Sequence, residues 1–337
     1  MNKSLLCLSI ATIIGSGPLF AEGNFLGGTL RVTGEYLYLK PTVENNYFVQ
    51  VSDETAVSNQ VVGREVQDQF SYSSGFRAEI GYQLCNKGEV SLGYSHLTSS
   101  TSKTVEGEFL STMLGDDRLG IDYAYYNGTA TNYMDVRFKN WGAYYTLDLC
   151  SQACCDFSLV LGLEYADIKF NQTALYVDST DEENATGRVA YTSKTRGLGP
   201  MGGFKMSCPL VSFGPDCCHV LQFKGSASGT LYVSRNIGHS TVDILDSNGV
   251  IDEQLVDLKR ERSSDLMPAL NARVGLGYDF SFKCIDASFE VGYQLASYYQ
   301  AVVRTHFPQD NGASFFSMRK YSNFNLQGLY ASGTLKF

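Results

Sequence analysis

The chain has 337 residues and a formal net charge of −9, from 26 Lys and Arg against 35 Asp and Glu. This balance argues against a nucleic-acid partner, because binding to phosphates requires a basic face. The 22 Tyr, 20 Phe and 33 Gly, with only 7 Pro, are typical of many β-strands separated by turns. A soluble β-sandwich and a membrane β-barrel share this composition, so the order of the residues must distinguish them.

The first residues have the pattern of a secretory signal peptide. Lys3 precedes an apolar segment, Leu5–Ile14, and Ala21 precedes an acidic, glycine-containing stretch. We therefore expect residues 1–21 to be a signal peptide that is cleaved after Ala21. Residues 22–337 contain no linker, charge block or low-complexity tract, and we expect them to form a single domain. After the signal, no stretch approaches the roughly 18 apolar residues that a membrane-spanning helix requires.

In the rest of the chain, apolar and polar residues alternate over segments of strand length. In Phe70–Leu84, Phe, Tyr, Ile and Leu occupy even positions, whereas Ser, Gly, Arg, Glu and Gln occupy odd ones. A tilted strand that crosses a bilayer needs about 9 to 11 residues, with apolar side chains toward lipid and polar or small ones toward the lumen. In chain order, the pattern predicts strands near 28–41, 69–84, 88–98, 132–149, 156–171, 193–207, 219–235, 267–282, 285–300 and 319–337.

These segments predict an all-β fold, namely a transmembrane antiparallel β-barrel of about 10 strands. An even number lets both termini face the periplasm. The hairpin signal Asn127-Gly128 supports an alternative of 12 strands. The last strand ends at Phe337, and such a terminal aromatic residue resembles the assembly signal of bacterial outer-membrane barrels. We therefore expect the protein in the bacterial cell outer membrane.

The predicted strand 132–149 changes phase along its length. Met134, Val136 and Phe138 are apolar at even positions, whereas apolar residues from Trp141 onward fall at odd positions. We expect a β-bulge near Asn140, which would keep both sets on the lipid face.

The predicted connections fall into two classes. Those at 42–68, 99–131, 172–192, 236–266 and 301–318 are long and polar, whereas those near 85–88, 150–155, 208–218 and 283–285 are short. Because outer-membrane barrels place long loops outside and short turns in the periplasm, the short class marks the periplasmic rim.

All cysteines beyond the signal peptide lie in the short connections. They are Cys85, Cys150, Cys154, Cys155, Cys208, Cys217, Cys218 and Cys284. Cys208, Cys217 and Cys218 with His219 are ligand types for zinc, but adjacent cysteines chelate one ion poorly and the periplasm favours disulfides. We expect disulfides within or between turns, with free thiols and a metal site as alternatives. Eight cysteines allow 105 pairings, so the connectivity stays open.

The charged residues on the polar face of the predicted strands are candidates for lining a pore. They are Arg31, Glu35, Arg77, Glu79, Arg137, Lys139, Glu164, Lys205, Lys224, Arg273, Asp279 and Glu290. In a wide barrel such side chains would surround a hydrated channel and set its ion preference. In a narrow barrel they would pair with one another and fill the interior.

Several of these strands carry motifs of a known family. They are Glu35-Tyr-Leu-Tyr-Leu-Lys-Pro41, Gly75-Phe-Arg77 with Gly81-Tyr82, Leu92-Gly-Tyr94-Ser-His96, Gly197-Leu-Gly-Pro-Met-Gly202, Gly275-Leu-Gly-Tyr278 and Glu290-Val-Gly-Tyr-Gln294. With them the chain resembles the major-outer-membrane-protein-like, pore-forming barrels of Legionella and of chlamydia-related bacteria. Leu39 stands where that family often has Trp, and the abundance of cysteine is more similar to the chlamydia-related branch, whose envelopes resemble disulfide-linked protein networks. The resemblance implies a porin-like barrel without catalytic activity.

Two other patterns carry no chemistry. Gly197–Gly202 matches G-x-G-x-x-G, but Pro200 interrupts it and no helical pattern follows, so we expect no cofactor. His96 and His306 fall near predicted outer strand ends without a nucleophilic Ser or paired Asp, so we expect no enzyme.

The sequence therefore predicts a porin that passes small hydrophilic solutes and ions by passive diffusion. The alternative is a structural envelope protein with little or no pore activity, crosslinked by the turn cysteines. The expected partners are outer-membrane lipid and the outer-membrane assembly machinery. A homo-oligomer and disulfide-linked envelope proteins are further alternatives.

Overall fold

The computed structural model describes residues 28–52, 63–84, 88–112, 126–152, 155–179, 186–214, 219–282, 285–306 and 318–337. The strands are β1 (Thr29–Val43), β2 (Tyr47–Val51), β3 (Arg64–Gln67), β4 (Ser73–Leu84), β5 (Gly88–Thr112), β6 (Tyr126–Gln152), β7 (Cys155–Asp178), β8 (Thr186–Phe213), β9 (His219–Leu245), β10 (Ile251–Phe282), β11 (Ile285–His306) and β12 (Met318–Lys336). No helix in these ranges is long and apolar enough to cross a membrane.

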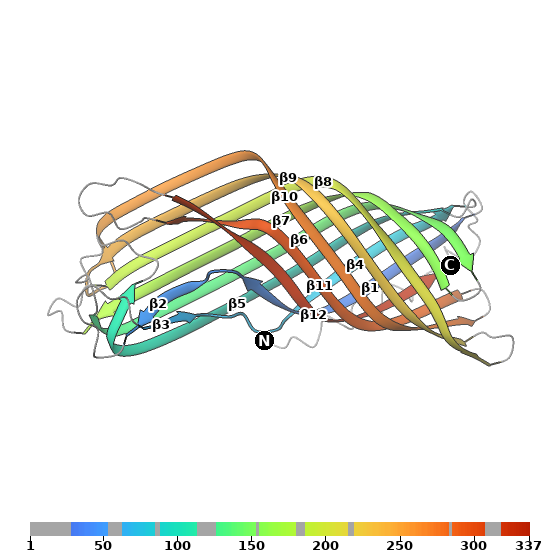
Figure 1. Cartoon of the computed structure of the whole chain (residues 1–337), viewed down its shortest axis with the longest axis horizontal. Helices are drawn as coiled ribbons and strands as arrows, with labels where there is room; N and C mark the ends of the chain where they lie inside the picture. Colours follow the sequence, from blue (N-terminus) through green and yellow to red (C-terminus); the bar gives the residue numbers. More distant parts are fainter. Residues whose placement is uncertain are drawn as a thin grey trace.

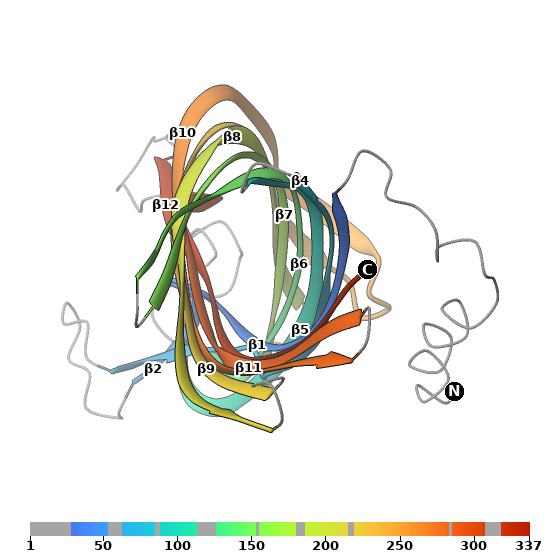
Figure 2. The same cartoon turned by 90° about the vertical axis from the view of Figure 1, so that its right-hand side faces the viewer.

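Ten of these strands form a closed antiparallel barrel. The strands from β4 to β12 pair in chain order, and β1 pairs with both β4 and β12. The barrel is long, its strands are tilted, and it is flattened in cross-section (Figures 1 and 2). The prediction of an all-β barrel with ten strands in the wall is therefore confirmed.

The two remaining strands extend the sheet at one place. β2 pairs with β3 and with the far end of β5, where Val49 lies opposite Thr112. The predicted hairpin at Asn127-Gly128 is wrong, because Gly128 lies within β6 and pairs with both β5 and β7. Both neighbouring strands hold the residue in a continuous ladder, so no turn can form there.

The strands are longer than predicted, and they take up much of the sequence that we expected to form long loops. β9 and β10 continue to a tight turn at residues 246–250, within the predicted loop 236–266. Asp246 Oδ1 accepts hydrogen bonds from the backbone N–H groups of Asn248 and Val250, which lowers the pKa of Asp246, with the Val250 bond as the main cause. Polar composition indicated a loop here because a strand outside the membrane needs no apolar outer face.

The apolar face of the wall changes side along the strands. On β7, Leu161 and Leu163 face outward and are 50% and 56% exposed, whereas Ile168 and Phe170 face inward and are 1% exposed. The first pair lies in the part of the wall that faces lipid. Where the strand continues beyond the lipid, its apolar side chains are shielded from water only inside the barrel.

This change of side explains the phase change on β6, which we had interpreted as a β-bulge. The pairing of β6 with β5 and β7 is unbroken through Asn140, so the expected β-bulge is absent. Val136 and Phe138 are buried in the interior. Because neighbouring residues of a strand face opposite sides, Arg137 and Lys139 lie on the outer surface and not in the lumen.

The interior holds two apolar cores, one above the other along the barrel. The first includes Leu37, Leu97, Met134, Val136, Phe138, Ile168, Phe170, Tyr232, Met267, Tyr298, Phe324 and Leu326. The second, toward the end that carries β2 and β3, includes Phe48, Val49, Leu110, Tyr126, Tyr176, Val189, Tyr191 and Val242. Together they fill the lumen over the half of the barrel that is distant from the C-terminus.

Two backbone segments cross this part of the lumen. Asn45 O, between β1 and β2, accepts a hydrogen bond from Arg304 of β11 (2.6 Å), and Phe48 O of β2 accepts one from the Tyr176 hydroxyl of β7 (2.6 Å). β11 turns inward after Gln300, whose φ is 57°, so that Val303 N donates to Ser193 Oγ of β8 (3.0 Å). These contacts join walls that are not neighbours in the sheet.

Candidate functional site: a charged cavity below an aromatic closure

The end of the barrel that carries the C-terminus encloses a polar cavity of about 410 Å³. Nine of the twelve predicted lumen residues line it: Arg31, Glu35, Arg77, Glu79, Lys205, Lys224, Arg273, Asp279 and Glu290. Glu164 lines an adjoining cavity of about 120 Å³ together with Arg77 and Arg273. Alternation thus located ten of the twelve side chains in the lumen, and Arg137 and Lys139 are the exceptions.

Glu35 lies at the centre of the charges in this cavity. Its two carboxylate oxygens accept hydrogen bonds from Arg77 (3.2 Å) and from Arg273 (2.5 Å), and its side chain is only 3% exposed. These residues come from β1, β4 and β10, so the network connects strands that do not all pair. A buried carboxylate needs such partners, because removing one charge from water without compensation costs several kcal/mol.

Other pairs surround this centre. Arg31 forms ion pairs with Glu79 and with Glu89, which the sequence reasoning did not single out. Lys224 contacts Asp279 at 2.9 Å. Lys205 makes no ion pair with any residue that the structure describes, although it lines the same cavity. The inward charges therefore mostly pair, as expected for a narrow barrel.

Tyrosine hydroxyls donate hydrogen bonds to the two remaining lumen carboxylates, those of Glu164 and Glu290. Glu164 accepts hydrogen bonds from the hydroxyls of Tyr144 (2.9 Å) and Tyr232 (2.7 Å), and Glu290 accepts one from Tyr330. Gly292 makes room for the Val274 carbonyl and for Tyr330, because a Cβ at this position would lie 2.2 Å from Val274 O and 2.6 Å from the Tyr330 hydroxyl oxygen. The glycine of the Glu290–Gln294 motif thus has a steric reason.

An aromatic layer closes the lumen directly above the cavity. The ring of Phe138 on β6 lies 5.3 Å from that of Tyr298 on β11 and 6.0 Å from that of Phe324 on β12, centroid to centroid. Tyr298 in turn lies 6.3 Å from Tyr232 on β9. We call Phe138, Tyr232, Tyr298 and Phe324 the aromatic closure. All four are at most 6% exposed, so little space remains between them.

Comparison with known proteins places this barrel in a family. Residues 28–337 match the family model of the Legionella pneumophila major outer membrane protein precursor. The chain belongs to this family. It is therefore a bacterial outer-membrane barrel, as the alternation and the resemblance predicted. None of the curated proteins matches its sequence.

Similarities to solved barrels are weak. The outer membrane protease OmpT of Escherichia coli is 10% identical with a TM-score of 0.43, and the match covers 92% of this chain and 96% of that one. A Pseudomonas aeruginosa FadL homologue is 9% identical with a TM-score of 0.26, covering 92% and 90%. The toluene transporter TodX of P. putida is 9% identical with a TM-score of 0.22, also covering 92% and 90%. We draw no functional argument from them.

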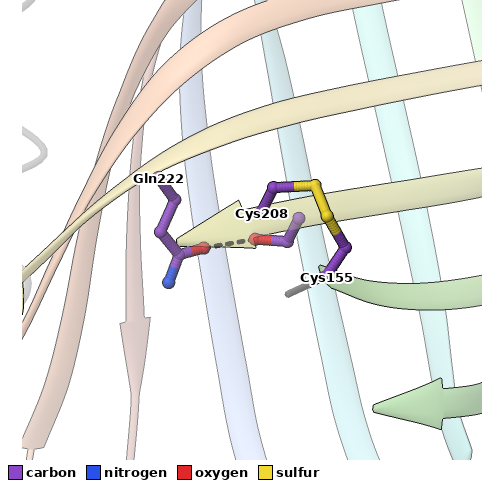
Figure 3. The surroundings of a disulfide bond; sticks show 4 residues. Cys155, Cys208 and Gln222 are labelled. Atoms are coloured by element: carbon purple, nitrogen blue, oxygen red, sulfur yellow. Dashed lines mark hydrogen bonds between the residues drawn. A yellow bond between two sulfur atoms is a disulfide. The ribbon is translucent and has the colours of Figure 1, made fainter. Parts of the chain in front are cut away.

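One disulfide joins the neighbouring strands β7 and β8 at the end of the barrel that carries the C-terminus. Cys155 at the start of β7 bonds to Cys208 near the end of β8, with Cα atoms 4.2 Å apart (Figure 3). Cys85, Cys154, Cys217, Cys218 and Cys284 lie outside the described residues, as does the side chain of Cys150. In the described part, no group of three or more His, Cys, Asp or Glu side chains is placed to hold a metal ion.

Phe337 lies where the barrel closes. Its backbone N–H donates to Leu30 O (2.9 Å), and Leu30 N donates back to Phe337 O (3.2 Å). The side chain is 44% exposed and follows Leu329 and Leu335 on the outer face of β12. Its role as an assembly signal stays a prediction.

Two parts of the site could not be found by alternation. Arg304 falls within the predicted loop 301–318, yet it is 5% exposed in the lumen. The expected β-bulge near Asn140 places Phe138 on the lipid face, whereas the unbroken pairing turns it into the lumen. The change of apolar phase between Phe138 and Trp141 is the signal in the sequence that the inner face becomes apolar.

Proposed function

We propose that this barrel is a porin-like channel that passes small hydrophilic solutes and ions by passive diffusion, and that the conformation described is its closed state. The observation that supports this proposal is the cavity of about 410 Å³ that nine inward charges line. Charged side chains of both signs around a water-accessible lumen hold permeant ions at many weak sites. A barrel that served only as an anchor would need no such cavity.

Passage requires the aromatic closure to open. The closure is a layer of side chains, and Tyr298 stands directly before the place where the β11–β12 pairing shifts, between Tyr298 and Val302. The segment Ala301–Arg304, which crosses the lumen, follows this shift. We propose that movement of this segment toward the wall withdraws Tyr298 from Phe138. The same movement would release Asn45, which Arg304 holds, so that the second core also parts and the cavity connects to the outer mouth.

The protein is not an enzyme in this proposal. The lumen carboxylates Glu35, Glu164 and Glu290 are engaged by Arg or Tyr partners, which suits a wall of fixed charge better than acid–base chemistry.

The second candidate is a structural envelope barrel. The two cores that fill half of the lumen favour it, because a permanently filled barrel conducts nothing. The six cysteines outside the observed disulfide would then join the barrel to neighbouring envelope proteins. Non-reducing electrophoresis of isolated envelopes tests this candidate, and a monomer band that reductant leaves unchanged would exclude intermolecular crosslinks.

Planar-bilayer recording of the refolded full barrel tests the porin. We expect brief or small conductance steps in KCl, since the closed state dominates. If neither the wild type nor a variant with an emptied closure conducts, the porin proposal fails and the structural candidate remains.

A further inference from the structure

On the outer surface of β6 to β9, a row of apolar side chains is followed directly by a row of mostly basic ones. Trp141, Tyr165, Leu198 and Val233 lie in register across the four strands and face outward. The next outward row, farther from the C-terminal end, is Lys139, Asp167, Arg196 and Arg235. The row after that begins with Arg137, Lys169 and Lys194. We call the six cations in these two rows the basic patch.

Part of the basic patch has no carboxylate partner among the residues that the structure describes. Asp167 is the one carboxylate in its two rows on these strands, and it contacts Arg196 at 3.3 Å. Asp135, one row farther out, accepts hydrogen bonds from Asn171. Arg137, Lys169 and Lys194 form no ion pair with any described residue.

Such a row of like charges is unfavourable by itself. Arg137 lies directly opposite Lys169, and Lys169 lies directly opposite Lys194. Directly opposed side chains on antiparallel strands have Cβ atoms about 5 Å apart, and like charges in these positions destabilise the pair. The arrangement therefore points to an anion that neutralises all three, in a protein whose overall charge is −9.

The position of the basic patch identifies the anion. It lies immediately beyond the exposed apolar row, on the side away from the C-terminal end and hence toward the outer leaflet. Arg137 and Lys169 also line a shallow hollow of about 570 Å³ with Ser74, Thr98, Ser100 and Asp135, and the Asp135 carboxylate accepts hydrogen bonds from Asn171. An amphipathic ligand could place acyl chains on Leu198 and Val233 and its phosphates in this hollow.

We infer that the basic patch binds the phosphates of lipopolysaccharide in the outer leaflet. Multiple cations match a headgroup that carries more than one phosphate, and hydroxyls in the hollow add hydrogen-bond donors to its oxygens. This binding site lies outside the lumen, so it does not depend on whether the barrel conducts.

The test uses the refolded full barrel and a charge-neutralised variant, R137Q/K169Q/K194Q. Lipopolysaccharide retention is measured after detergent washing, in parallel with dephosphorylated lipopolysaccharide and with phosphatidylglycerol. We expect the variant to bind lipopolysaccharide about tenfold more weakly, because each exposed ion pair to a phosphate contributes little and the variant loses three of them. We also expect the wild type to discriminate against both other lipids.

Two further variants make the result decisive. K40Q removes an outward cation on β1, on the opposite side of the ring order, and should leave binding unchanged. The charge-preserving variant R137K/K169R/K194R should bind like the wild type, which separates loss of charge from loss of fold. Equal binding by the neutralised variant and the wild type would overturn the inference. Equal retention of phosphatidylglycerol or of dephosphorylated lipopolysaccharide by the wild type would overturn it too.

Discussion

Phe138 and Tyr298 lie on opposite walls of the barrel, on β6 and β11, and their ring centroids are 5.3 Å apart. Four strands separate β6 from β11 in either direction around the ring, so this contact spans the lumen at its greatest separation in strand order. The barrel is flattened in cross-section (Figure 2), and side chains of β6 and β11 meet across its lumen. The contact divides the interior into a charged cavity and an apolar half.

The aromatic closure should stabilise the barrel as well as close it. Replacing Phe138 by Ala should lower the free energy of unfolding by about 3 to 5 kcal/mol, because it leaves a cavity among rigid neighbours. Phe204→Ala, on the lipid face, should have a smaller effect, since lipid fills the vacated space. Urea unfolding in the same lipid compares the two, and equal losses would contradict the buried position of Phe138.

The Glu35 network should be sensitive to removal of its one carboxylate. Glu35→Gln leaves Arg77 and Arg273 without their shared counter-charge and should destabilise the barrel by about 3 to 5 kcal/mol. The control is Glu106→Gln on an exposed part of β5, for which we expect a change within about 0.5 kcal/mol. Should both variants unfold at the same urea concentration, the charges of the cavity would be solvated and not paired.

Arg304 should set the ion preference of an open channel. Its guanidinium lies 5.2 Å from the Phe170 ring centroid, and its Nε and Nη2 atoms have no hydrogen-bond partner among the described residues. An unpaired cation in the path attracts anions, so Arg304→Glu should shift the reversal potential in a KCl gradient toward cation preference. Lys259→Glu, exposed on β10, serves as the control. Identical shifts for both would show that Arg304 lies off the path.

The disulfide between Cys155 and Cys208 should stabilise the barrel, because it links two strands of the same molecule. Replacing both Cys155 and Cys208 by Ser should lower stability by at most about 4 kcal/mol, the loop-closure value for their separation of 53 residues. Unfolding of the wild type with and without reductant should show the same difference. Mass spectrometry of oxidised protein that finds both thiols free would disprove the pairing.

The alternation of apolar and polar residues predicts most of the barrel wall. All ten wall strands were located, and ten of twelve charged candidates face the lumen, because a lipid-facing wall forces a period of two. The rule failed for Arg137 and Lys139, where β6 leaves the lipid and its inner face becomes apolar. It also missed Arg304, because a segment that turns into the lumen after Gln300 has no lipid-facing side to mark it.

The closed-channel proposal depends most on the contact of Phe138 with Tyr298. The most direct measurement is single-channel recording of F138A/Y298A beside the wild type, with F204A as a lipid-face control. We expect the double variant to show larger or longer conductance steps than the wild type, and F204A to match the wild type. A double variant that folds, by its circular dichroism, but conducts no more than the wild type would contradict a closure at this layer.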